Sequence, residues 1–154
     1  MKRTLFISII ISFLLTSCGN DVVFRKYNKM ANVSWNRFDI QNFEVPVKKG
    51  DVLDFYLSIR HHPDFPFDKI WINVTFYKPD GSMRSRDYEF DLKDKDGKWL
   101  SDCMGELCDI DLPIHKELAF NKTGNCRVRV ENKNSKYETP GIIEVGLVVK
   151  RSPN

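Results

Sequence analysis

The sequence has no long apolar segment after its first 15 residues, no excess of charge and no internal repeat. About 20 apolar residues are needed to span a bilayer as a helix, and the apolar run from Leu5 to Leu15 is shorter than that. Lys and Arg number 24 against 21 Asp and Glu, and two of the positive charges, Lys2 and Arg3, precede this run. The remainder is nearly neutral, so nucleic acid is not an expected partner.

Short motifs of catalytic sites are also missing. There is no Gly-x-Ser-x-Gly elbow, no glycine-rich phosphate loop and no His-Glu-x-x-His. His61, His62 and His115 form no cluster with the cysteines at a metal-ligand spacing. Adjacent His61 and His62 on a strand would also point to opposite faces. We therefore expect no enzyme activity, no metal site and no small-molecule substrate.

The N-terminus has the three parts of a bacterial lipoprotein signal. Lys2 and Arg3 precede the apolar run, and Leu15-Thr16-Ser17-Cys18 follows it as a lipobox. We expect cleavage after Ser17, acyl chains on Cys18 and no other cofactor, and anchoring to a membrane of the bacterial cell envelope, the outer membrane. The alternative is an ordinary signal peptide, after which Cys18 forms a disulfide.

Three further cysteines, Cys103, Cys108 and Cys126, make an odd number for a chain in an oxidising compartment. We expect one disulfide and one leftover thiol. A bond between Cys103 and Cys108 would close a short loop. A bond from Cys126 to either of them is the alternative.

From Trp35 onward, apolar and polar residues alternate as they do in half-buried strands. Residues 69–92 predict a hairpin around the turn Pro79-Asp80-Gly81-Ser82. The segment from Leu107 to Phe120 alternates too, although Pro113 favours an edge position. Ile142 to Val149 is apolar on both faces apart from Glu144, which indicates a central strand.

No amphipathic helix longer than two turns is predicted. Six to eight short strands separated by polar turns predict an all-β protein, an antiparallel β-sandwich of jelly-roll or immunoglobulin-like type. We divide the chain into a lipoprotein signal peptide (residues 1–17), a partly ordered, lipid-attached tether (residues 18–33) and a β-sandwich domain (residues 34–151).

Aromatic residues around a stiff loop form the expected interaction surface. The loop His61-His62-Pro63-Asp64 ends a strand and continues into two phenylalanines separated by a proline. We interpret it mainly as a rigid connector packed by Phe65 and Phe67. The residues expected to contact partners are Trp35, Asp64, Phe65, Phe67 and Trp99. Three tryptophans, Trp35, Trp71 and Trp99, also allow a sugar-stacking platform, although packing in the core or at its rim is favoured.

Several segments occur in an order known from one protein family. They include the lipobox, Leu57-Ser58-Ile59-Arg60, Asp64-Phe65-Pro66-Phe67 and Pro79-Asp80-Gly81. The most specific are Asp94-Lys95-Asp96-Gly97-Lys98-Trp99-Leu100 and Gly141-Ile142-Ile143-Glu144-Val145-Gly146-Leu147. In this order the chain resembles the gliding-motility lipoprotein family of the GldH type. It departs from the family at Ser101-Asp102-Cys103-Met104-Gly105, where a glycine-rich stretch is usual, and at Cys126, where an aromatic residue is usual.

The resemblance implies a non-enzymatic accessory component of the gliding machinery. Its partners would be other envelope proteins, of the motility or secretion machinery, to which the membrane-anchored domain docks. A carbohydrate-binding β-sandwich of a surface or periplasmic lipoprotein is the alternative function.

Overall fold

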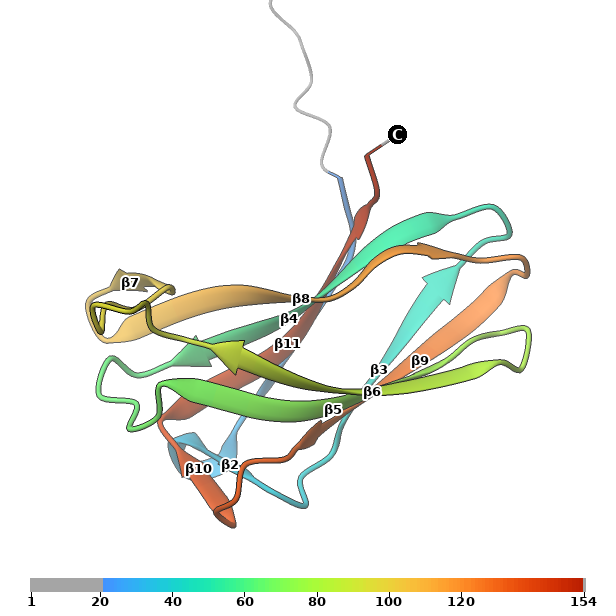
Figure 1. Ribbon diagram of the computed structural model, residues 1–154. Helices are drawn as coiled ribbons and strands as arrows, with labels where there is room; N and C mark the ends of the chain where they lie inside the picture. The colour runs from blue at the N-terminus through green and yellow to red at the C-terminus, as the bar shows by residue number, and fades with distance from the viewer. Residues whose placement is uncertain (1–20, 154) are drawn as a thin grey trace, which may run out of the picture.

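The computed structural model describes residues 21–153, which form two antiparallel β-sheets packed face to face (Figure 1). Its strands are β1 (Val22–Lys29), β2 (Ser34–Asn36), β3 (Gln41–Val47), β4 (Val52–His61), β5 (Lys69–Tyr77), β6 (Met83–Asp91), β7 (Asp102–Met104), β8 (Leu107–Ala119), β9 (Gly124–Asn132), β10 (Glu138–Pro140) and β11 (Ile142–Arg151). A single 3-10 turn, Ala31–Val33, follows β1. The predicted signal peptide and Cys18 lie outside the described residues.

The strand order is that of a jelly roll. One sheet has the order β1-β11-β4-β8-β7 and the other β3-β9-β5-β6, and a short ribbon of β10 and β2 lies at one end. Consecutive long strands alternate between the two sheets, except in the β5–β6 hairpin. The predicted antiparallel β-sandwich is confirmed, and of its two expected forms the jelly roll is observed.

The described residues contain more strands than the six to eight predicted, eleven in all. Eight of them are seven residues or longer, whereas β2, β7 and β10 have three residues each. Three residues are too few to show an alternating pattern, so the sequence does not mark these short pairings.

The first strand corrects the predicted domain boundary. Residues 22–29, expected to belong to a tether, form β1 and pair with β11 along their whole length. Tyr27 lies over Gly146, where an added Cβ would be 2.3 Å from a ring carbon of the tyrosine. The sandwich therefore begins at residue 22 rather than 34. Both ends of the described chain emerge together (Figure 1), and the Arg151 amide donates to the Asp21 carbonyl at 2.8 Å.

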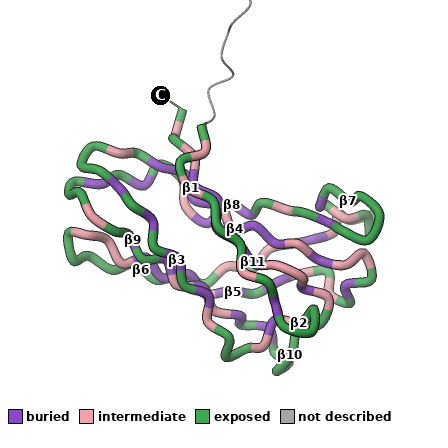
Figure 2. Tube along the Cα trace, turned by 180° about the vertical axis from the view of Figure 1, so that it is seen from behind, coloured by how far each residue is buried: buried purple, intermediate pink, exposed green. Residues whose placement is uncertain are grey.

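Alternating residues of the strands fill the space between the sheets (Figure 2). Phe43, Val45 and Val47 of β3 are buried and their neighbours are exposed. The hairpin predicted over residues 69–92 is formed by β5 and β6. Strand β11 lies between β1 and β4, as its apolar faces predict. Apolar burial on this scale is the main source of stability in such a fold.

A buried polar network ties the β2–β10 ribbon to the end of β9. The Asn132 side-chain amide donates to the Trp35 carbonyl at 2.9 Å and to the Thr139 hydroxyl at 2.8 Å. Asn134 donates to the same hydroxyl at 3.0 Å. Trp35 itself is fully buried, and its indole N–H donates to the Asp39 carbonyl at 2.8 Å. The expectation that Trp35 belongs to an interaction surface is wrong, because its side chain faces the core.

Candidate functional site

An aromatic cluster lies where the loop after β4 meets the segment before β7. The ring of His61 is 5.5 Å from that of Phe65 and 4.6 Å from that of Trp99, and Phe65 is 5.4 Å from Phe67. The Trp99 indole N–H donates to the Pro63 carbonyl at 3.2 Å. The structure thus brings three of the predicted contact residues together with a histidine.

Only part of this aromatic cluster reaches the surface. Phe65 is 2% exposed, so the expectation that it contacts partners is wrong; the loop turns its ring inward against His61. Phe67 and Trp99 are half-buried, and lysine side chains lie over both rings. Asp64, at the tip of the loop, is exposed. Most of the aromatic cluster is therefore packed inside the protein, and only the half-buried rings of Phe67 and Trp99 contribute to the surface.

His61 is fully buried and serves as a structural bridge. Its Nδ1 lies 2.9 Å from the His62 carbonyl, which can only accept, so Nδ1 carries the proton. Its Nε2 therefore accepts from the Ser101 hydroxyl at 2.7 Å. Burial lowers the pKa of His61 below its ordinary value, although the hydrogen bond to the His62 carbonyl acts in the other direction. The neutral ring links β4 to the segment that enters β7.

A disulfide closes the hairpin formed by β7 and the start of β8, residues 102–109, which we call the cysteine hairpin. Cys103 and Cys108 are partners in the strand register and are bonded to each other. Arg60 on β4 holds the base of the hairpin through two hydrogen bonds to Asp109, of 2.7 and 3.1 Å. Planar, two-point pairing of this kind fixes geometry as well as charge. The cysteine hairpin is thus held at its tip and at its base.

Large apolar side chains are exposed on and beside the cysteine hairpin. Met104 is 86% exposed, Leu100 54% and Leu107 42%. Met104 and Leu107 are opposite each other in the register of β7 and β8, so their side chains are neighbours. We call these three residues the hairpin patch. No pattern in the sequence marks these residues, because the only signal of this segment is its pair of cysteines.

Within residues 21–153 the remaining cysteine is buried, and no group of side chains suited to hold a metal is found. Cys126 is the unpaired cysteine, and burial raises the pKa of its thiol to about 12, which leaves no thiolate to react. Within this part of the chain no buried side-chain polar atom lacks a hydrogen-bond partner, and no three His, Cys, Asp or Glu residues form a group that could hold a metal. The same residues include no helix with the length and hydropathy of a membrane span.

The tryptophans of the sugar-platform alternative lie apart. Trp35 is in the core, Trp71 is 39% exposed on β5, and Trp99 is half-buried beside the cysteine hairpin. No ring of one stacks on a ring of another within residues 21–153. The geometry thus gives the carbohydrate alternative no support from paired rings.

Comparisons with known proteins agree with the resemblance. The model of the family described as GldH lipoprotein matches residues 22–149. A protein of Christiangramia forsetii named gliding motility lipoprotein GldH homolog is 24% identical over 98% of this chain and 97% of its own length.

Solved structures give only distant likenesses. Two chains of infectious bursal disease virus, one from the VP2 subviral particle and one from the Gx strain, match 85% of this chain with TM-scores of 0.37 and 0.30 and identities of 10% and 11%. The chain spans about a third of the length of either. The match to the family model covers nearly the whole described chain, so this chain belongs to the GldH lipoprotein family.

Proposed function

We propose that this envelope lipoprotein is a non-enzymatic accessory part of the gliding-motility machinery, and that it docks other envelope proteins through the hairpin patch. Membership of the GldH lipoprotein family supports the link to motility. The observation that carries the docking role is the exposure of Met104, Leu100 and Leu107 on one rigid end of the sandwich.

Exposed apolar groups of this kind suit a protein interface. Exposed apolar side chains that lie next to one another, as Met104 and Leu107 do, are typical of surfaces that bind other proteins. The disulfide and the Arg60–Asp109 pair hold the cysteine hairpin in one conformation, so little freedom is lost when a partner binds. The patch also lies on a projecting end of the molecule, at β7, where a large partner has access (Figure 1).

His61 and Cys126 have structural roles in the fold, and this supports a non-enzymatic function. His61 is a natural candidate for a general base, but both of its ring nitrogens are committed to hydrogen bonds inside the protein. Cys126 is a natural candidate for a nucleophile, but its thiol is buried and stays protonated. Both side chains therefore have a structural role: His61 through its hydrogen bonds and Cys126 through its packing.

We infer further that acyl chains on Cys18 hold the domain at the outer membrane. Mass spectrometry of the mature N-terminal peptide is expected to find Cys18 as the first residue, carrying fatty acids, and density fractionation to find the protein with outer-membrane markers. A Cys18→Ser variant is expected to be absent from the outer-membrane fraction and to keep its signal peptide. An unmodified Cys18 would end this part of the proposal.

Site-specific crosslinking in cells tests the docking role. A photoreactive amino acid replaces Met104, and the crosslinked products are identified by mass spectrometry. We expect envelope proteins of the motility or secretion machinery to be captured, and capture to fall about tenfold when Leu107→Glu puts a charge into the patch.

Val52 is the matched control for this experiment. It is 44% exposed, like Leu107, but lies at the other end of β4, roughly 30 Å from the cysteine hairpin at about 3.3 Å per residue. The same photoreactive residue at Val52 is expected to capture none of these proteins. Equal capture at both positions, or none at Met104, would show that the hairpin patch is not a docking surface.

A further inference from the structure

One side of the sandwich is open, where the edge strand β6 faces β8. Strand β6 pairs with β5 alone, and β7 covers β8 only over Leu107–Asp109. Residues 83–91 make no backbone hydrogen bond on their outer side to any residue between 21 and 153. Between the two strands lies a hollow of about 230 Å³, which we call the edge groove; its apolar lining is Val74, Phe76 and Ile114. The open strand edge and the edge groove together could receive an extended chain.

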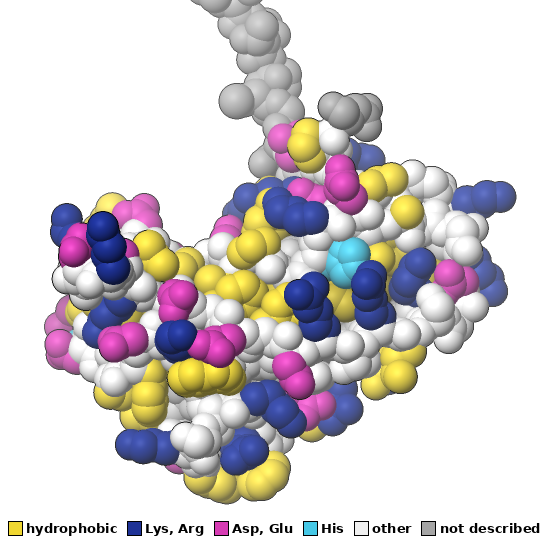
Figure 3. All heavy atoms as spheres, in the orientation of Figure 1, with side chains coloured by type: hydrophobic (Ala, Val, Ile, Leu, Met, Phe, Trp, Pro, Cys, Tyr) yellow, Lys and Arg dark blue, Asp and Glu magenta, His cyan; other side chains and the backbone are white. Residues whose placement is uncertain are grey.

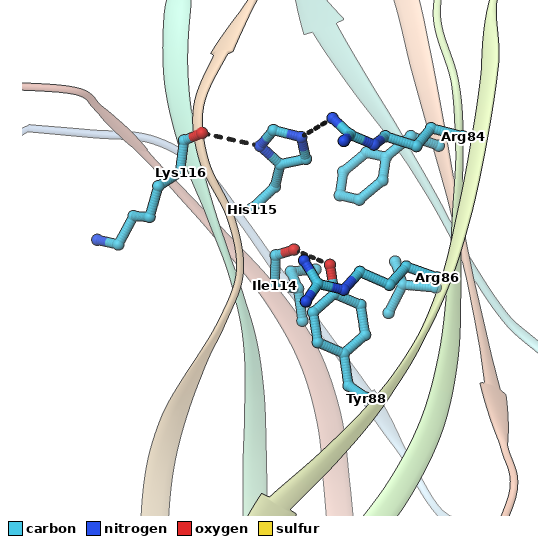
Figure 4. Close-up of a pocket in the computed structure, with 8 residues that line it drawn as sticks. Arg84, Arg86, Tyr88, Ile114, His115 and Lys116 are labelled. Atoms are coloured by element: carbon cyan, nitrogen blue, oxygen red, sulfur yellow. Dashed lines mark hydrogen bonds between the residues drawn. The ribbon is translucent and has the colours of Figure 1, made fainter.

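Two arginines of β6 reach across the edge groove toward β8 (Figure 4). Arg84 Nη1 donates to Nε2 of His115 at 3.1 Å, since Nδ1 of that ring is already bound to the Lys116 carbonyl at 2.9 Å. The Arg86 guanidinium lies 5.2 Å from the centre of the Tyr88 ring. Neither arginine forms an ion pair with a residue of the described chain.

The carboxylates of β6 lie on its other face and are already engaged. Asp87 accepts from the Asn73 amide at 2.8 Å, and Glu89 is paired with Lys69. Because side chains alternate along a strand, β6 is positive toward the edge groove and negative on the outside of the sheet. Figure 3 shows the positive side, where a histidine lies among Lys and Arg side chains next to hydrophobic ones.

The charge pattern of β6 determines which sequences can pair favourably with its free edge. A second copy of β6 would bring like charges together, and inward-pointing charges on edge strands are a common protection against such self-pairing. Directly opposite residues of paired strands interact, and opposite charges stabilise the pair. The edge therefore disfavours its own sequence and favours one with carboxylates at the groove-facing positions.

We propose that the edge of β6 binds an extended segment of an envelope partner that adds as a strand and places carboxylates opposite Arg84 and Arg86. The backbone of the added segment forms hydrogen bonds with the free N–H and C=O groups of β6, and its alternate side chains give specificity. The inference deepens the proposed docking function and rests on it for the origin of the ligand, but it concerns a separate site with a separate recognition chemistry.

The residues that an added strand would place opposite each position of β6 determine the sequence of a peptide probe for this site. A strand antiparallel to residues 84–89 needs acids opposite Arg84 and Arg86, bases opposite Asp87 and Glu89, and an apolar residue opposite Tyr88. The peptide core Lys-Val-Lys-Glu-Thr-Glu meets these needs. Its exchanged form, Glu-Val-Glu-Lys-Thr-Lys, has the same composition and the opposite pattern.

Titration of the fluorescent peptides with the full-length lipoprotein in detergent tests the proposal. The first peptide is expected to bind about tenfold or more tightly than the exchanged one, since two charge pairs are gained on each face rather than lost. The variant Arg84→Glu with Arg86→Glu should lose this preference, and should instead bind Lys-Val-Lys-Lys-Thr-Lys, whose groove-facing residues are reversed to match. Thermal unfolding verifies that the variant is folded. The variant Arg84→Gln with Arg86→Gln removes the two positive charges without adding negative ones, and should also weaken the preference for the first peptide.

Two control variants test whether peptide binding depends on net charge or on the hairpin patch rather than on Arg84 and Arg86. Lys95→Glu with Lys98→Glu changes the net charge equally at exposed positions outside the groove, and should leave peptide binding unchanged. Met104→Glu with Leu107→Glu should also leave it unchanged, while abolishing the crosslinks of the hairpin patch. Equal binding of the two peptides, or no binding to the native chain, would overturn the edge site and leave the hairpin proposal standing.

Discussion

Replacing Trp35 with alanine is expected to lower the free energy of unfolding by about 3–5 kcal/mol, the usual loss when a large aromatic core residue is removed. The side chain is fully buried, and its indole N–H is bound to the Asp39 carbonyl. The Trp35 carbonyl accepts a hydrogen bond from the Asn132 amide, which opposes movement of the backbone into the cavity. Urea denaturation of the mature protein, with midpoint and slope fitted together, measures the change.

Trp71 provides the matched control, because the same substitution there removes a side chain that is 39% exposed on the outer face of β5. Trp71→Ala should cost about 1 kcal/mol or less. If Trp35→Ala does not fold at all, Trp35→Phe keeps most of the ring and should give an intermediate loss. Equal losses for Trp35→Ala and Trp71→Ala would contradict the core position of Trp35.

Replacing Asp54 with alanine is expected to cost about 2–3 kcal/mol, because a buried carboxylate with several donors would be lost. Its Oδ1 accepts from the Glu117 amide at 2.8 Å and from the Ser152 hydroxyl at 2.6 Å, and its Oδ2 accepts from Lys116 at 3.1 Å. Glu117 has a φ of 54°, and β8 shifts its register against β4 beside Asp54. The carboxylate therefore fixes an irregular stretch of β8 that alternation alone would not form.

The same residue should make stability depend on pH. Burial raises the pKa of Asp54, but the hydrogen bonds from Glu117, Ser152 and Lys116 outweigh this, so the pKa lies below its ordinary value. A carboxyl group of this kind contributes stability above its unfolded pKa of about 3.9 and loses it as the pH falls through the folded pKa. The free energy of unfolding should therefore fall below about pH 5 by an amount that depends on Asp54.

Asp54→Asn separates this contribution from those of other carboxylates. The amide oxygen keeps the contacts of Oδ1 but carries no charge, so the loss at neutral pH should be smaller than in Asp54→Ala. The decline in acid should be shallower than in the native chain. Parallel declines below pH 5 in the two proteins would show that Asp54 does not titrate as described.

The strands with a regular burial pattern were predictable from the sequence. In β3 and β5, apolar residues face the core at nearly every second position. The inner face of β11 packs in the core through Val145, Leu147 and Val149, and on its outer face the Tyr27 side chain of the neighbouring strand covers Gly146. The first strand was not predictable in this way. Residues 22–29 lie at a sheet edge and are largely exposed on both faces, so they carry no alternation of apolar residues.

The contact residues were harder to predict than the strands. Whether Phe65 or Met104 is exposed depends on the packing of segments distant in the sequence, which no local pattern contains. The arginines of the edge groove did leave a signal. Tyr88 and Phe90 alternate with Asp87 and Glu89 in the sequence, and the same alternation carried back along β6 puts Arg86 and Arg84 on the face of Tyr88.

The direction of β1 has a mechanical consequence. The chain enters β1 at Val22, whereas the cysteine hairpin lies at the far end of the sheet, where Cys108 is opposite His61. A pull between the N-terminal end of β1 and the cysteine hairpin would act along the strands. Hydrogen bonds between antiparallel strands are perpendicular to them, so such a force loads the β1–β11 ladder in shear, all bonds at once, and does not unzip it one bond at a time. Pulled in this direction, β1 separates from β11 only when the hydrogen bonds of the ladder break together.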